Sequence, residues 1–144
     1  MKMSKTIGMF AVFAAALSSA ATAAEGGAPL TANLSGANEV PGPGDADGIG
    51  TAIVRVNPGR ERVCYTLRVS NIAPATAAHI HFANAGVNGP VVVGLQAPSG
   101  GSSQGCVKIS RDLAKALIQN PEGYYVNVHN AEFPAGAVRG QLGR

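Results

Sequence analysis

The sequence contains three histidines, and their spacing is suited to binding a metal ion. Two of them form the motif His79-Ile80-His81, and the third, His129, lies near the C-terminal end. Residues two apart on a β-strand project from the same face, roughly 7 Å apart at the backbone, so both imidazoles of such a motif can share one ion. The pattern predicts a metal site formed by His79, His81 and His129, with three scattered surface histidines as the alternative.

The donor atoms restrict the choice of metal. Neutral imidazoles without a thiolate or carboxylate favour copper or zinc, whereas magnesium and calcium prefer oxygen ligands. Copper is the first choice and zinc the second, because affinity at nitrogen sites peaks at copper in the divalent series. Three protein ligands would leave a fourth position for water or a small anion. No catalytic residue is assigned.

Polar residues close to His129 in the sequence are candidates for orienting the imidazole rings. Asn127, Asn130 and Glu132 are predicted to supply hydrogen bonds that fix the ring tautomers.

Arg139 is a further candidate near the site. Its neighbour Val138 is apolar, so the arginine is expected on the opposite strand face. We favour a structural role as a solvated or ion-paired arginine on an edge strand, with Glu39 or Glu132 as its partner. The alternative is a cationic guide that attracts anions to the metal.

The histidines must be positioned by strands whose other face packs into the core. Ile80, flanked by Ala78 and Phe82, is predicted to face inward, which turns His79 and His81 outward. The segment around His129 has the same phase: Val126 and Val128 face inward, whereas Tyr125, Asn127 and His129 face outward. All three histidines are therefore expected on the outer face of a sheet.

The composition favours an all-β domain. The 144 residues include 19 Gly and 9 Pro, and 13% are charged, about half the roughly 25% of average globular chains. Strands are predicted over residues 30–34, 49–56, 63–72, 77–82, 91–95, from 106 onward, 124–129 and 137–142. A Gly/Ser-rich connection is expected over 94–105, and one helix between Ser110 and Pro121. Together these elements predict a β-sandwich or barrel of Greek-key type with one short helix.

The N-terminal segment has the pattern of a signal peptide. Lys2 and Lys5 precede an apolar run over 7–17 and small residues over 18–24, with cleavage expected after Ala23. The run is shorter than the about 20 apolar residues that span a bilayer, although a retained anchor is the alternative. The predicted parts are a signal peptide over 1–23, a flexible lead-in over 24–29 and one domain over 30–144. We expect a periplasmic or secreted protein with no membrane span after cleavage.

Removal of this segment also changes the charge and the partners to expect. The formal net charge falls from +3 to +1, because residues 1–23 hold two lysines and no acidic residue. Without a cluster of basic residues the sequence gives no indication of nucleic-acid binding. A protein partner is not identified.

Outside the cytoplasm the two cysteines, Cys64 and Cys106, are expected to form a disulfide. Each alternates with apolar residues along its strand, so both sulfurs are predicted to leave their strands on the side away from the core. Closing this loop should stabilise the fold by about 3–4 kcal/mol. Two unrelated buried thiols are the alternative.

Four ordered blocks of the sequence resemble a known family. The blocks are residues 34–41 (LSGANEVP), 77–81 (AAHIH), 125–130 (YVNVHN) and 133–142 (FPAGAVRGQL). They are similar to the signature blocks of the CHRD domain, which is named from chordin and also occurs as small secreted bacterial proteins. The resemblance covers about residues 30–142, although Gly42 stands where the family often has a second proline. It implies an immunoglobulin-like or Cu/Zn superoxide dismutase-like β-sandwich.

The resemblance leaves two functions open. Cu/Zn superoxide dismutases are remotely similar, since their copper is also held by an H-x-H strand and further histidines, which leaves open copper redox or dismutase-like activity. This chain lacks the extra histidines and aspartate of their zinc subsite. The alternative is a non-enzymatic extracytoplasmic binding module, in which the HIH and NVHN strands form a polar recognition surface without a metal.

Overall fold

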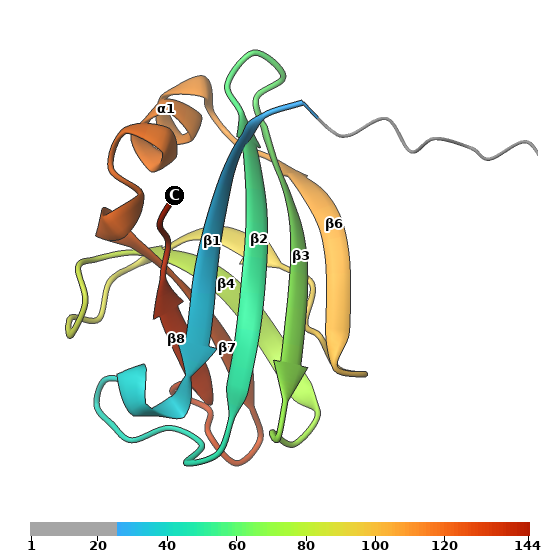
Figure 1. Cartoon of the computed structure of the whole chain (residues 1–144), viewed down its shortest axis with the longest axis vertical. Helices are drawn as coiled ribbons and strands as arrows, with labels where there is room; N and C mark the ends of the chain where they lie inside the picture. The colour runs from blue at the N-terminus through green and yellow to red at the C-terminus, as the bar shows by residue number, and fades with distance from the viewer. Residues whose placement is uncertain (1–25) are drawn as a thin grey trace, which may run out of the picture.

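The computed structural model describes residues 26–144, so the predicted signal peptide lies outside the described residues. It confirms the predicted all-β class with one short helix (Figure 1). The strands are β1 (Ala28–Ser35), β2 (Ile49–Asn57), β3 (Arg62–Ser70), β4 (Ala75–Phe82), β5 (Val91–Leu95), β6 (Ser102–Lys108), β7 (Tyr124–Asn130) and β8 (Val138–Gln141). The helices are η1 (Gly36–Asn38), α1 (Arg111–Gln119) and η2 (Pro121–Gly123).

Several strand boundaries differ from the sequence-based prediction, and the starts of β1 and β6 differ for a clear physical reason. β1 begins at Ala28, inside the predicted lead-in, because residues 28 and 29 already pair with Val56 and Arg55 of β2. β6 begins at Ser102, so the predicted Gly/Ser-rich connection ends earlier than residue 105. Its Ser and Gly residues are held in the strand by pairing with β3, which overrides their weak strand preference.

The eight strands form one antiparallel sheet in the order β5-β4-β7-β8-β1-β2-β3-β6. After β3 the chain crosses to β4, turns into β5 and returns to β6 beside β3, which is a Greek-key path. Figure 1 shows β1, β2, β3 and β6 in front, with β4 and β7 crossing behind them. The structure thus has one continuous curled sheet whose two halves face each other.

The two ends of the strand order lie close together, so the sheet is nearly closed like a barrel. Gln96, which follows β5, donates its backbone N–H to the Tyr65 hydroxyl at 2.7 Å. Its carbonyl accepts a bond from the Ser103 hydroxyl of β6, also at 2.7 Å. These contacts join the β5 end to the β3–β6 end.

The core lies between the two halves and is made of alternating strand residues, as the sequence pattern predicts. Its largest fully buried aliphatic side chains are Leu30, Leu67, Ile80, Leu117, Leu142, Val54, Val56, Val63, Val126, Val128 and Val138. Phe82 lies opposite Tyr124 at the end of β4, and half of its surface is exposed. The predicted inward position therefore does not bury this ring.

Helix α1 contributes to the same core. The Ser110 hydroxyl accepts a hydrogen bond from the Leu113 N–H at 3.1 Å and so caps the first turn. Leu117 and Ala114 are fully buried against the strands. No helix in residues 26–144 has the length and apolar character needed to cross a membrane.

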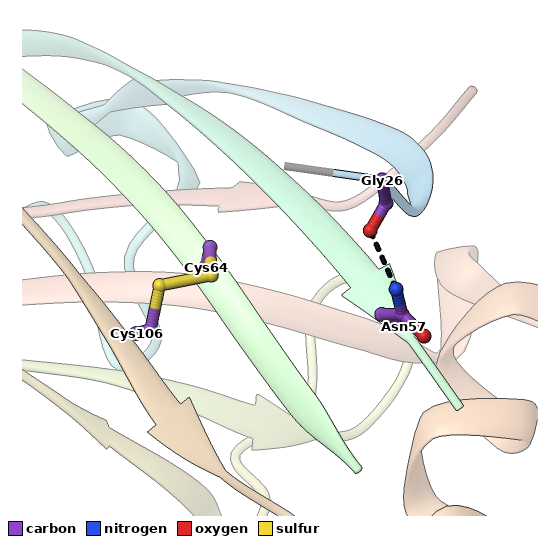
Figure 2. The surroundings of a disulfide bond; sticks show 4 residues. All are labelled: Gly26, Asn57, Cys64 and Cys106. Atoms are coloured by element: carbon purple, nitrogen blue, oxygen red, sulfur yellow. Dashed lines mark hydrogen bonds between the residues drawn. A yellow bond between two sulfur atoms is a disulfide. The ribbon is translucent and has the colours of Figure 1, made fainter. Parts of the chain in front are cut away.

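The cysteines lie opposite each other on neighbouring strands and form a disulfide (Figure 2). Cys64 of β3 pairs in register with Cys106 of β6, and the two sulfurs are 2.09 Å apart. Figure 2 also shows the Asn57 side chain, which donates to the Gly26 carbonyl at 2.7 Å and fastens the start of the described chain to the end of β2.

Candidate metal centre

The three histidines lie on the outer face of β4 and β7, and the strand register brings them close together. His79 is opposite Asn127, and Ala77 is opposite His129 one step along the same face. His81 is opposite Tyr125. Because facing residues on antiparallel strands have Cβ atoms about 5 Å apart, neighbouring pairs on this face put the imidazoles within reach of one another.

The ring nitrogens converge on one point. His79 Nδ1 lies 3.2 Å from His129 Nε2. One nitrogen from each of the three rings lies within 4.8 Å of the other two. The ring centroids are 5.5 Å apart for His79 and His81 and 5.1 Å apart for His79 and His129.

Backbone carbonyls fix the tautomers of two of these rings. His81 Nδ1 lies 2.9 Å from the Gly89 carbonyl, and His129 Nδ1 lies 3.1 Å from the Pro134 carbonyl. Since a carbonyl oxygen can only accept, both Nδ1 atoms must carry the proton and donate it. The Nε2 atoms of His81 and His129 therefore keep their lone pairs, which are what a metal ion requires.

Gly89 can approach this closely because it has no side chain. A Cβ atom at Gly89 would collide with the Phe82 carbonyl. The glycine therefore lets the end of the 83–90 loop lie against β4 and present its carbonyl to His81.

The donor set fits copper or zinc. Two nitrogens bound at about 2.0–2.1 Å in a tetrahedral site lie about 3.3 Å from each other, close to the separation of His79 Nδ1 and His129 Nε2. His81 Nε2 is a buried nitrogen with no hydrogen-bond partner among residues 26–144. A buried polar atom normally has a partner, and a metal ion would provide one here.

Burial keeps the histidines neutral. Desolvation lowers the pKa of His79 below its usual value. Desolvation also lowers the pKa of His81 and of His129, against the opposing effect of their carbonyl partners, and the nearby histidines and Arg139 add to the lowering. Neutral imidazole is the form that binds metal, so this environment favours binding over protonation.

Loops cover the outer face around the histidines, which the sequence did not predict. Tyr125 and Asn127 are each 1% exposed and His81 is 8% exposed. Residues of the 36–48, 83–90 and 131–137 segments contact the side chains of this face. The histidines have the predicted outward phase, but His81 lies under a loop, whereas His79 and His129 are half-buried.

Arg139 is buried at the centre of this covered face and pairs with Glu39. Its Nε donates to Glu39 Oε2 at 3.2 Å, and both side chains are nearly inaccessible to solvent. The expectation of an edge-strand arginine is wrong, because β8 lies between β7 and β1 inside the sheet. Of the two predicted partners, Glu39 forms the ion pair, whereas Glu132 is exposed.

The remaining donors of Arg139 hold two loops. Nη1 donates to the Val87 carbonyl at 3.3 Å. Nη2 donates to Asn88 Oδ1 at 2.6 Å and to the Val40 carbonyl at 3.4 Å. With these partners inside the protein the guanidinium is engaged in structure, which supports the structural role over that of a guide for anions.

Glu39 occupies a tight polar site beside Arg139. Burial raises the pKa of Glu39 to about 7, although Arg139 and the Asn127 amide pull it downward. Gly136 has a φ of +144°, and a Cβ atom there would collide with the Glu39 carboxylate. The glycine is thus required both by its backbone conformation and by the space that the carboxylate takes.

The predicted ring-orienting side chains do not contact the imidazole nitrogens directly. Asn127 donates to Glu39 Oε2 at 3.5 Å. Asn130 donates to the Ala73 carbonyl at 3.3 Å and accepts from the Phe133 N–H at 2.8 Å, which shapes the turn that carries Pro134. The backbone carbonyls of Gly89 and Pro134 orient the rings instead.

Tyr125 contacts the site although it was not selected from the sequence. Its ring stacks on His81 at a centroid distance of 4.7 Å and an interplanar angle of 6°. The Arg139 Cζ atom lies 4.2 Å from the centre of the same ring. The available signal was strand phase, since Tyr125 shares the outward face of β7 with His129.

The fold and this cluster define an all-β domain with a candidate metal centre on one outer face of its sheet. The sequence pattern of one family, described as the CHRD domain, matches residues 30–142. The chain therefore belongs to the CHRD domain family, as its sequence blocks predicted. Comparisons with curated proteins and with solved structures give no significant match.

Proposed function

We propose that this CHRD domain binds one transition-metal ion, with copper as the first choice and zinc as the second. The ligands would be His79 Nδ1, His81 Nε2 and His129 Nε2. The observation that carries the proposal is the convergence of three imidazole nitrogens within 4.8 Å, two of them in rings whose Nδ1 protons are fixed by carbonyls. Bound copper would supply one-electron redox chemistry, whereas bound zinc would not.

The protein is proposed to act outside the cytoplasm, in the periplasm or after secretion. The predicted signal peptide over 1–23 and the Cys64–Cys106 disulfide support this location. The alternative of a polar recognition surface on the HIH and NVHN strands is less well supported, because His81 and Asn127 are buried under loops.

Metal titration of the mature protein tests the proposal. Wild type, His81→Ala and His129→Ala are titrated with Cu(II), Cu(I) and Zn(II), and circular dichroism verifies that each variant is folded. We expect one ion bound per wild-type chain and at least a tenfold loss of affinity in each variant. Equal uptake by the three proteins would reject the shared site and favour the metal-free binding module.

The pH dependence of affinity provides a second test. Protons compete with the metal for imidazole, so affinity should fall as the pH decreases. Because burial lowers the pKa of all three histidines, the fall should begin below the usual histidine pKa of about 6.5. Affinity that stays constant until the protein unfolds in acid would contradict imidazole ligation.

A further inference from the structure

We propose that Tyr125 is a positioning residue that fixes the direction of His81 Nε2 in the metal site. This role rests on the proposed metal binding, and it assigns to the ring and hydroxyl of Tyr125 two separate contributions. The ring supports the His81 imidazole by stacking, and the hydroxyl holds the loop that supplies the His81 hydrogen bond.

The ring contribution follows from a stack that spans three strands. His81 of β4 and Tyr125 of β7 are register partners, and their rings are nearly parallel. Arg139 of β8 places its guanidinium against the same tyrosine ring and is itself held by Glu39. A buried aromatic ring packed by a cation and an imidazole has little freedom to rotate, so it restricts the imidazole as well.

The hydroxyl contribution runs through Gly89. The Gly89 N–H donates to the Tyr125 hydroxyl at 3.2 Å, and the Gly89 carbonyl accepts from His81 Nδ1 at 2.9 Å. One peptide segment thus connects tyrosine and histidine. Arg139 holds the same loop through Val87 and Asn88, so the carbonyl that sets the His81 tautomer is fixed from two sides.

His81 needs this support more than the other two histidines. His79 and His129 contact each other directly through Nδ1 and Nε2. His81 Nε2, in contrast, has no hydrogen-bond partner within the described part of the chain. The direction of this nitrogen therefore depends on the Gly89 hydrogen bond and on the Tyr125 stack.

Two substitutions separate the contributions, and the chain offers a matched control. Tyr125→Leu removes ring and hydroxyl, whereas Tyr125→Phe removes the hydroxyl alone. Tyr65 is the control, because it is also buried and its hydroxyl also accepts a backbone N–H, while its strand β3 pairs with neither of the histidine-bearing strands β4 and β7. Tyr65→Leu and Tyr65→Phe should reproduce the loss of stability without affecting the metal.

Cu(II) affinity and the electron paramagnetic resonance spectrum of the bound Cu(II) are measured for all five proteins. We expect Tyr125→Leu to weaken Cu(II) binding about 10–100-fold and to change the spectrum, with a smaller effect in Tyr125→Phe. Both Tyr65 variants should keep the wild-type affinity and spectrum. Wild-type binding by Tyr125→Leu would overturn the role of Tyr125 and leave the proposed function intact, whereas a wild type that binds no metal would overturn both.

A metal-free measurement keeps the proposal testable if Tyr125→Leu fails to fold. Nitrogen NMR of the imidazoles should show a single Nδ1-protonated tautomer for His81 in wild type. Tyr125→Phe should shift His81 toward a mixture of tautomers, because Gly89 loses one of its anchors. An unchanged His81 tautomer together with unchanged Cu(II) affinity in Tyr125→Phe would overturn the hydroxyl contribution.

Discussion

The two halves of the sheet have outer faces of opposite character, although both follow the same alternation. On the half formed by β1, β2, β3 and β6, the outward residue Ile53 is 47% exposed, and the outward disulfide residue Cys106 is exposed too. On the β4–β7–β8 half, the outward residues Tyr125, Asn127 and Arg139 are at most 3% exposed. The faces differ in what covers them.

The covering segments come from distant parts of the chain. Glu39 and Val40 reach Arg139 from the segment after β1, and Asn88 reaches it from the β4–β5 loop. Alternation decides which way a side chain points, whereas long-range loop contacts decide whether it is buried. The direction of a side chain is therefore a local property of its strand, whereas its burial depends on the whole fold.

The largest expected effect comes from removing the cation of the covered face. Arg139→Ala removes the ionic partner of the buried Glu39 carboxyl and the donor to three loop acceptors, which should cost about 3–5 kcal/mol of the free energy of unfolding. Arg111→Ala is the control, because Arg111 pairs with Glu61 at 3.8 Å with both side chains substantially exposed, and it should cost at most about 1 kcal/mol. Urea unfolding of both variants measures the difference. Equal losses would mean that the two faces do not differ energetically.

On the β1–β2–β3–β6 half, whose outer face is exposed, the largest expected loss of stability comes from removing the disulfide. The double variant Cys64→Ala, Cys106→Ala opens a loop with a sequence separation of 42 and should lose about 3–4 kcal/mol. Thr66→Ala with Gln104→Ala is the matched control, since these residues also pair across β3 and β6, and it should lose less than about 1 kcal/mol. Calorimetry under non-reducing conditions measures both, and two free thiols in alkylated native protein would contradict the premise.

The sequence could predict the strands, the helix and the outward phase of the histidines, because these depend on local alternation and on capping residues. Ser110 and Pro121 delimit the helix through local chemistry. The position of β8 inside the sheet could not be predicted, since it depends on pairing with a strand about 100 residues earlier. For this reason Arg139 was expected at an edge.

The hydrogen-bond partners of the rings were also beyond prediction. Gly89 and Pro134 act through their backbone carbonyls, which every residue has, so their side chains give no signal. Asn127 and Asn130 have the right chemistry and lie near His129 in the sequence, yet their amides are used by Glu39 and by a turn. Proximity to His129 in the sequence therefore identified the right region of the protein but not the groups that contact the imidazole rings.

An effect of intermediate size is expected in the pH dependence of the free energy of unfolding, through Glu39 on the covered face. Burial raises the pKa of Glu39 to about 7, whereas its pKa in the unfolded chain is near 4.5. Between these two pH values the Glu39 carboxyl is therefore protonated in the native state and ionised in the unfolded state. The contribution of Glu39 is thus fully present below pH 4.5 and is lost as the pH rises through 7. It should amount to on the order of 1–3 kcal/mol.

Glu39→Gln isolates this contribution from that of the histidines, whose lowered pKa values act in the opposite direction. The stability of wild type relative to Glu39→Gln should decrease from pH 4.5 to 7 and then stay constant. Denaturant unfolding at half-unit pH steps measures the difference. A difference that increases over this range would show that Arg139 outweighs burial and keeps Glu39 ionised.

The smallest expected change in stability comes from replacing an exposed apolar residue of β2. Ile53→Thr should change the free energy of unfolding by no more than about 0.5 kcal/mol, because Ile53 points to solvent from β2. Val54→Thr, the next residue on the inward face, should cost about 1–3 kcal/mol since Val54 is fully buried. Thermal unfolding of the two variants compares adjacent residues that point to opposite faces of β2. Similar losses of stability would contradict the assignment of Val54 to the inner face and Ile53 to the outer face.

The place of β8 has a consequence for the order in which the protein folds. β8 connects β7 to β1, and Arg139 is the register partner of Ser35 at that junction. Until β1 pairs with β8, the strands form two groups of neighbours, β6-β3-β2-β1 and β5-β4-β7-β8. Such long-range closure is slow compared with forming hairpins. Because Arg139 both pairs across this junction and binds Glu39 and Val40, the 36–48 segment can cover this face only when the two groups of strands have joined.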